Sequence, residues 1–168
     1  MSLDLSRLRI LIADDDTFIL SLTRSILNGF GISNIELAMD STKVFDELSA
    51  GTYDILILDW DIEPENGVEV TRRIRMDPDS NNRYLPVIMM TGHAELSVVL
   101  EARDAGVTEF LAKPMTVRSI YQRVVSVIER PRPFVRSSDY FGPDRRRMDD
   151  PNFSGKDRRA AEEDEFEI

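Results

Sequence analysis

Two short groups of aspartates in the sequence are each preceded by an apolar run. The runs cover residues 9–13 and 54–58, and the aspartates that come after them are Asp14, Asp15, Asp16, Asp59 and Asp61. Carboxylates about 4 Å apart repel each other by roughly 4 kcal/mol at an effective dielectric constant near 20, and a nearby cation offsets that repulsion. A small set of carboxylate oxygens is typical of Mg2+ sites. The aspartates therefore predict a magnesium site, provided that the fold brings the two groups together.

Two more polar residues follow apolar runs in the second half of the sequence. Thr91 follows residues 85–90, and Lys113 follows residues 109–112. A carboxylate nucleophile, a metal, a lysine and a hydroxyl together supply the positioning and charge neutralisation that phosphoryl transfer needs. Each feature alone has a simpler explanation, because aspartates cap helices, threonines are common in loops, and a lysine before Pro114 could be a solvent-exposed residue. Four such features at the ends of four apolar runs favour a shared site.

The apolar runs alternate with segments of helical spacing. The expected strands are residues 9–13, 35–39, 54–58, 85–90 and 109–112. Apolar residues recur at helical spacing within residues 19–26, 44–48, 68–74, 98–102 and 117–128. Nearly continuous apolar strands are typical of parallel sheets that are covered on both faces. The pattern predicts an α/β fold, a (βα)5 doubly wound five-stranded parallel sheet, with its ligand site at the C-terminal ends of the strands.

The composition excludes several classes of protein. The chain has 168 residues, of which 42% are hydrophobic and 31% charged, enough for one core and an appendage. It contains no cysteine, which excludes disulfides, thiolate zinc sites and a cysteine nucleophile. No apolar run approaches the roughly 20 residues that cross a bilayer, and Asp4 stands where a signal peptide would be positive. We therefore expect a cytoplasmic protein, and its net charge of -10 disfavours nucleic acid as a partner.

The composition changes after residue 130. Pro131 and Pro133 mark the boundary, because proline ends helices and biases the preceding residue towards extended backbone. In residues 131–168, Leu, Ile, Val and Phe total only 6 of 38 residues. So little apolar surface does not offset an ordering entropy of about 1 to 2 kcal/mol per residue. We expect a folded domain over residues 1–130 and a charged, largely disordered tail over residues 131–168.

Four motifs, in this order and spacing, resemble those of the receiver domain of two-component response regulators, which has the CheY-like, flavodoxin-like fold. The motifs are Leu-Ile-Ala-Asp14-Asp15-Asp16, Leu-Ile-Leu-Asp59-Trp60-Asp61, Met-Met-Thr91-Gly92 and Leu-Ala-Lys113-Pro114. The resemblance covers roughly residues 7–130. It implies that Asp59 accepts a phosphoryl group from a phosphohistidine on a sensor histidine kinase or a phosphotransfer protein. It also implies that Mg2+ is held by Asp14, Asp15, Asp59 and the backbone carbonyl of Asp61.

The same resemblance assigns roles to three residues beyond the acceptor and the metal ligands. It implies that Lys113 pairs with the phosphoryl oxygens. The peptide bond between this lysine and the proline after it, here Pro114, is often cis in this family. It implies that Thr91 is drawn towards the phosphoryl group and that Phe110 swings inward as Thr91 moves. The sequence departs from the family at residues 62–67, where the family more often has Met-Pro directly after the residue matching Asp61. Phe110 also lacks the hydroxyl of a tyrosine.

The leading functional hypothesis is a phosphoacceptor switch rather than an enzyme. Phosphorylation of Asp59 would alter the face formed by residues 94–105 and 110–128, which would then bind or release an unidentified protein target. An alternative is a haloacid-dehalogenase-like phosphatase, because Asp59 and Asp61 fit its Asp-x-Asp pair. The order of motifs argues against it, since the acidic pair here comes first in the chain.

A third hypothesis is a binding module that acts through the Arg-rich tail. Residues 142–146 and 155–159 repeat a Gly-x-Asp-Arg-Arg pattern, and Phe141 and Phe153 stand shortly before the two copies. Paired arginines match phosphate or carboxylate groups. A solvated tail that lies loosely on the acidic domain is the simpler alternative.

Overall fold

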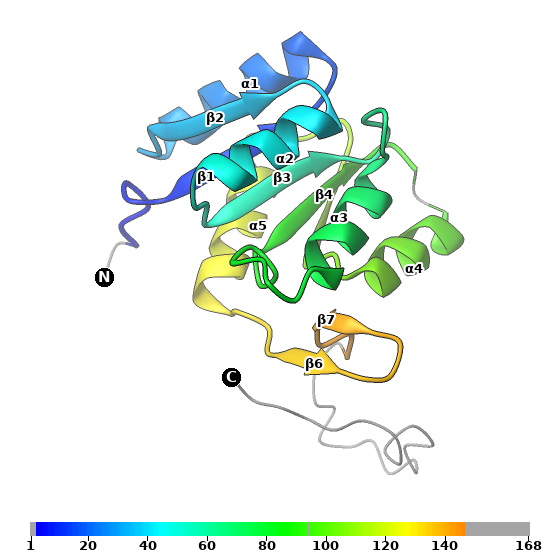
Figure 1. Cartoon of the computed structure of the whole chain (residues 1–168). Coiled ribbons are helices and arrows are strands. Elements are labelled where there is room, and N and C mark those ends of the chain that lie inside the picture. Colours follow the sequence, from blue (N-terminus) through cyan, green and yellow to red (C-terminus); the bar gives the residue numbers. More distant parts are fainter. Residues whose placement is uncertain (1–2, 94, 147–168) are drawn as a thin grey trace.

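The computed structural model describes residues 3–93 and 95–146, and its core is a sheet of five parallel strands (Figure 1). The strands lie in the order β2-β1-β3-β4-β5, and every neighbouring pair is parallel. Their bounds are β1 (Arg9–Ala13), β2 (Asn34–Ala38), β3 (Ile55–Asp59), β4 (Val87–Thr91) and β5 (Glu109–Ala112). The strand order reverses between β1 and β3, and ligands of doubly wound sheets bind at such a point. The predicted fold class is confirmed.

Five helices cover the two faces of this sheet. They are α1 (Thr17–Gly29), α2 (Ser41–Ala50), α3 (Gly67–Met76), α4 (Leu96–Ala105) and α5 (Val117–Glu129). Alternate strand residues point to opposite faces: Leu11 and Leu56 pack with α2, α3 and α4, whereas Ile10 and Ile57 pack with α1 and α5. Among the described residues, no helix has both the length and the apolar character of a membrane span.

The chain continues past α5 into an antiparallel hairpin of β6 (Phe134–Arg136) and β7 (Phe141–Pro143). We call residues 131–146 the arm, and Figure 1 shows its hairpin at one end of α3 and α4. The expectation of a largely disordered tail is therefore wrong for residues 134–143. Residues 147–168 of that tail, which include the second Gly-x-Asp-Arg-Arg copy, lie outside the described residues. The hairpin has an aromatic core that it shares with the receiver domain, because Phe134 and Phe141 each lie edge-on to Tyr84, with ring centroids 5.0 and 5.3 Å apart.

The arm docks over a buried arginine of α3. Arg75 is only 1% exposed. Its Nε and Nη2 donate to the carbonyl of Gly106 at 3.1 and 3.0 Å, and its Nη1 donates to the carbonyl of Arg83 at 2.8 Å. The guanidinium also lies 5.0 Å from the centroid of the Phe134 ring. Burial lowers the pKa of Arg75 to about 9, which leaves the side chain charged at neutral pH.

Close backbone contact and two ion pairs complete the docking of the arm. A Cβ on Gly142 would lie 3.1 Å from the Cα of Gly106 and 2.6 Å from the hydroxyl of Tyr140, so only glycine fits there without rearrangement. Arg145 pairs with Asp104 of α4 at 2.9 Å. Arg132 pairs with Glu109 of β5 at 3.5 Å. The arm therefore contacts α3, α4 and β5 together.

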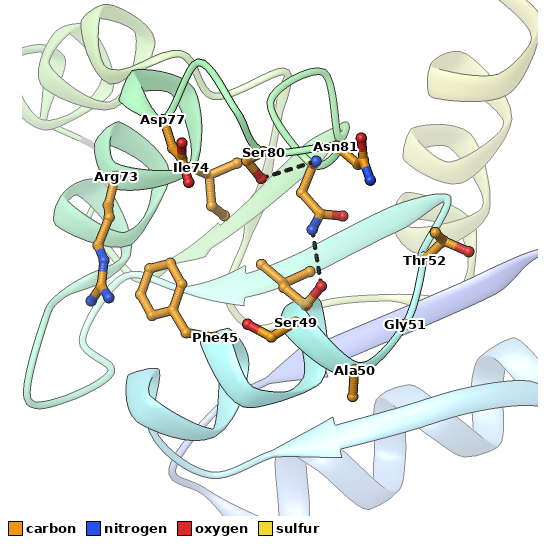
Figure 2. Close-up of a pocket in the computed structure, with 12 residues that line it drawn as sticks. Phe45, Ser49, Ala50, Gly51, Thr52, Arg73, Ile74, Asp77, Ser80 and Asn81 are labelled. Carbon is orange, nitrogen blue, oxygen red and sulfur yellow. Dashed lines mark hydrogen bonds between the residues drawn. The ribbon is translucent and has the colours of Figure 1, made fainter.

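A cavity of about 590 Å³ lies between α2 and α3, and Figure 2 shows residues that line it. It is formed by Phe45 and the end of α2 on one side, and by Arg73 and the loop after α3 on the other. The Arg73 guanidinium lies 3.9 Å from the centroid of the Phe45 ring. Loops that run from a helix into a strand lie at the N-terminal edge of a parallel sheet, so this cavity is at the edge opposite to the predicted site.

Candidate functional site

The aspartates that follow β1 and end β3 meet at the C-terminal edge of the sheet. One carboxylate oxygen from each of Asp14, Asp15 and Asp59 lies within 4.8 Å of the others. The adjacency of β1 and β3 explains this, because Ala13 is in register with Leu58. Asp14 is fully buried and Asp59 is 3% exposed, whereas Asp15 is exposed at the rim. Asp14 and Asp15 of the first group thus lie together with Asp59 of the second.

Asp16, the third aspartate of the first group, has a different role. Its carboxylate accepts hydrogen bonds from the backbone N–H of Phe18 at 2.8 Å and of Ile19 at 3.3 Å, so it caps the N-terminus of α1. The capping explanation for the Asp-Asp-Asp group therefore applies to Asp16. It orients the start of α1, while the carboxylates before it face the site.

Lys113 follows β5, and its side chain extends across β4 to both buried carboxylates. Its Nζ donates to Oδ1 of Asp59 at 2.7 Å and to Oδ2 of Asp14 at 2.9 Å. The loop that carries it is fixed to the neighbouring strand, since the backbone N–H of Lys113 donates to the carbonyl of Thr91 at 2.8 Å. The peptide bond between Lys113 and Pro114 is cis. One ammonium group thus donates hydrogen bonds to two carboxylates.

The charges at this edge do not balance. Burial raises the pKa of Asp59 and the negative charge of Asp14 raises it further, against the hydrogen bond from Lys113 that lowers it. Burial alone would lower the pKa of Lys113, but its bonds with Asp59 and Asp14 outweigh burial and raise it. The single positive charge of Lys113 is smaller than the combined negative charge of the two buried carboxylates and the exposed Asp15. A set of oxygen donors with excess negative charge fits a small divalent cation such as Mg2+.

Thr91 and Phe110 lie on the neighbouring strands β4 and β5. Thr91 ends β4 and is mostly buried, and its Oγ1 accepts a hydrogen bond from the backbone N–H of His93 at 2.9 Å. Phe110 is half-buried and packs against the core on the α2, α3 and α4 face. In the register of β4 and β5, Phe110 pairs with Met89 and Thr91 pairs with Ala112. The hydroxyl of Thr91 is therefore held by its own loop in this conformation.

The loop after Asp61 follows a path that the sequence did not indicate. Its Glu63–Pro64 peptide bond is cis. The carbonyl of Glu63 accepts from the backbone N–H of Ser41 at 2.9 Å, and the hydroxyl of Ser41 accepts from the backbone N–H of Glu65 at 3.0 Å. At the rim, His93 Nε2 lies 3.5 Å from Oδ2 of Asp61. These hydrogen bonds attach the loop to the N-terminus of α2.

Gly67 is a positioning residue that the sequence analysis missed. A Cβ at this residue would lie 2.6 Å from the backbone oxygen of Asp59 and 2.8 Å from Sδ of Met89. The absence of a side chain lets α3 begin directly against the strand that carries Asp59. Its signal was present in the sequence, because Asn66 and Glu69 form a capping box around this glycine.

Comparison with known proteins agrees with this geometry. The sequence matches the response regulator receiver domain family over residues 10–125, and the chain belongs to that family. It is 30% identical to the chemotaxis protein CheY of Pseudomonas aeruginosa over 123 residues, which are 73% of this chain and 98% of the relative. It is 28% identical to the chemotaxis protein CheY-3 of Vibrio cholerae, covering 73% of this chain and 93% of the relative. The family match ends before the arm begins.

Solved structures show the same fold. A putative response regulator from Chloroflexus aurantiacus superposes with a TM-score of 0.68 at 25% identity, over 73% of this chain and 98% of that one. The receiver domain of a sensor histidine kinase from Pseudomonas aeruginosa PAO1, solved with a magnesium ion coordinated in its active site cleft, has a TM-score of 0.62 at 24% identity, over 71% and 94%. Receiver domains are phosphoacceptor switches rather than classical enzymes. The match gives no support to the phosphatase alternative.

Proposed function

We propose that this chain is a phosphoacceptor switch of a histidine-aspartate phosphorelay, with Asp59 as the acceptor. The observation that carries the proposal is the lysine bridge, in which Nζ of Lys113 lies 2.7 Å from Asp59 and 2.9 Å from Asp14. In the step, a carboxylate oxygen of Asp59 attacks the phosphorus of a phosphohistidine on a sensor kinase or phosphotransfer protein. The new O–P bond forms as the N–P bond breaks, and the imidazole nitrogen leaves with the electron pair. Lys113 is placed to pair with the transferred phosphoryl oxygens.

The carboxylates of Asp14, Asp15 and Asp59, together with the backbone carbonyl of Asp61, are the proposed Mg2+ ligands. When bound, the ion neutralises charge on the phosphoryl oxygens. The donor set supports this assignment, because three carboxylate oxygens lie within 4.8 Å of one another and, among the described residues, Lys113 is the one lysine that contacts them. The related receiver domain with magnesium in its active site cleft adds support by similarity of fold.

The proposed output of the switch is the face of α4, β5 and α5. Thr91 would exchange its bond with His93 for one with the phosphoryl group, and Phe110 on the adjacent strand would move inward. Such a change biases a two-state element, and a protein target would bind one state in preference to the other. We assign residues 1–130 to the receiver domain and regard the arm as an extension of it. A cytoplasmic location stays a prediction.

Removal of the exposed metal ligand is expected to separate metal binding from folding. Asp15→Asn changes an exposed side chain, so without Mg2+ the free energy of unfolding should stay within about 1 kcal/mol of wild type. At Mg2+ tenfold above its dissociation constant, wild type should gain about 1.4 kcal/mol, and the variant should lose most of that gain. Urea unfolding with and without Mg2+ measures both values. Asp46→Asn, an equal charge change on α2, serves as the control, and an undiminished Mg2+ effect in Asp15→Asn would contradict the ligand assignment.

Thr91→Ala is expected to uncouple phosphorylation from the output face. Thr91 contacts neither the attacking oxygen nor Lys113's ammonium group in the bonds described above, so the variant should still accept phosphate from acetyl phosphate. The backbone amide shifts of Phe110 and α4 should then change less than in phosphorylated wild type, and NMR spectra of both forms test this. Thr42→Ala on α2 is the matched control. Equal shift changes in Thr91→Ala and wild type would rule out the coupling.

A further inference from the structure

The arm, α4 and β5 enclose a groove of about 350 Å³ on the proposed output face. Its walls combine apolar side chains from the receiver domain, namely Val99, Leu100 and Phe110, with the arginines Arg103, Arg132 and Arg145. Arg132 and Arg145 belong to the arm, so two of the three arginines are placed in the groove by the docking of the arm. The aspartate cluster does not contribute to it.

The groove is positively charged in a protein whose net charge is -10. Three arginines line it against one carboxylate, that of Glu109. Arg132 pairs with Glu109 through Nη2, and its Nη1 donates to the backbone oxygen of Asp144 at 3.4 Å. Arg145 pairs with Asp104 through Nη1, and its Nε and Nη2 have no hydrogen-bond acceptor among the described residues, so they can bind a ligand. The Nε of Arg103 is buried and has no hydrogen-bond acceptor among the described residues. Its Nη2 lies 3.4 Å from the carboxylate of Asp104, so the three groove arginines share the two carboxylates of Asp104 and Glu109 and leave an excess of positive charge that favours a carboxylate ligand.

We propose that this groove binds the acidic segment of the same chain, residues 161–168. The segment holds five acidic residues, Glu162, Glu163, Asp164, Glu165 and Glu167, and it also carries Phe166 and Ile168. Its carboxylates match the three arginines, and its two apolar side chains match the apolar wall. The pairing of carboxylates with guanidinium forks is bidentate and charge-assisted.

The position of the arm favours this occupant over an acidic segment of another molecule. Arg145 lines the groove, and the described chain ends one residue later at Arg146. Fifteen residues, 147–161, separate that point from Glu162, and fully extended they span up to about 50 Å. The segment is thus tethered beside the groove, and a tether of this length gives an effective concentration on the order of millimolar. An untethered acidic peptide has no such advantage.

Occupancy would cover Phe110 and one side of α4, so the segment would compete with any partner that binds there. The binding itself does not depend on the proposed phosphorylation of Asp59. The experiment is therefore done on the unphosphorylated full chain, and its failure would leave the acceptor assignment untouched.

The absence of cysteine allows a direct distance test. Ala161→Cys introduces the only thiol of the chain, and a nitroxide spin label on it broadens nearby amide signals in the 15N-labelled full-length protein. We expect strong broadening at Val99, Leu100 and Phe110, relative to the same protein with the label reduced. Amides of α1, on the other face of the sheet, should be unaffected. Unbroadened signals at the three groove residues would overturn the proposal.

Charge variants test whether the arginines hold the segment. Arg103→Gln should lower the docking equilibrium constant about tenfold, as for loss of one charge-assisted hydrogen bond, whereas Arg24→Gln on α1 should leave it unchanged. Combined Glu162→Gln, Glu163→Gln and Glu165→Gln changes test the segment without altering the receiver domain, and they should abolish the broadening. Equal broadening in all variants would contradict the proposal. Broadening that appears only between 15N-labelled and spin-labelled copies in a mixture would overturn docking within one chain.

Discussion

Asp59→Asn is expected to abolish phosphorylation of the chain by acetyl phosphate. Wild type with Mg2+ should show one phosphoryl adduct by intact mass, and none in the presence of a chelator. The amide of asparagine has no anionic oxygen to form the O–P bond, although it can still accept the hydrogen bond from Lys113 that now lies at 2.7 Å. The expected effect is therefore on the chemistry and not on the fold. A loss to below detection corresponds to a rate at least about a hundredfold lower, or roughly 2.7 kcal/mol in barrier.

Asp61→Asn provides the matched control for this experiment. It makes the same chemical change two residues away on an exposed side chain, and it keeps the backbone carbonyl that is the proposed ligand. This variant should still form one adduct. Thermal unfolding of both variants checks that they are folded. An unchanged adduct in Asp59→Asn, or loss of the adduct in Asp61→Asn alone, would show that the acceptor is misassigned.

Arg75→Met is expected to give the largest loss of stability outside the aspartate cluster. Replacing a buried ion pair by an apolar residue can be neutral, because both charges are removed together. Arg75 differs, since its partners are the carbonyls of Gly106 and Arg83, which stay in place without a donor. Each buried acceptor left unpaired costs about 1 to 3 kcal/mol. We expect a loss of about 2 to 4 kcal/mol, together with release of the arm, because Phe134 also loses the guanidinium against its ring.

Urea unfolding of the full chain measures this loss. Arg72→Met is the control, because Arg72 is an exposed residue of the same helix whose ion pair with Glu101 spans 3.9 Å. That change should cost less than about 1 kcal/mol. Limited proteolysis gives a second readout, since the arm should be cleaved faster in Arg75→Met than in Arg72→Met. A cost below about 1 kcal/mol in Arg75→Met would mean that the arm does not depend on this residue.

The sheet and the aspartate cluster were predictable because both depend on short-range patterns. The β1 and β3 strands are continuous apolar runs, and a parallel sheet places the residues that follow such runs at one edge. Lys113 could be placed at that edge from the sequence. Its simultaneous contact with Asp14 and Asp59 could not, because it depends on how far the side chain reaches across β4.

The arm was not predictable because its stability depends on contacts distant in sequence. In the sequence, Arg75 looks like one more arginine of a helix that already carries Arg72 and Arg73. Only the packed structure shows that it is buried beneath the hairpin. Counting Leu, Ile, Val and Phe also omitted Tyr140, which is buried and donates to the carbonyl of Pro143 at 2.7 Å. The path of residues 62–67 was missed for a similar reason, since it is set by Ser41.

The three-point attachment of the arm has a consequence for the energetics of the proposed switch. The arm contacts α4 through Arg145 and β5 through Arg132 at the same time, so its docking free energy depends on how these two elements lie relative to each other. Any movement of α4 against β5 therefore alters that free energy. By thermodynamic reciprocity, the docked arm alters the free energy of the movement by the same amount. The arm then acts as a permanent intramolecular effector. Substitutions within the arm can change the equilibrium of the switch while the aspartates stay the same.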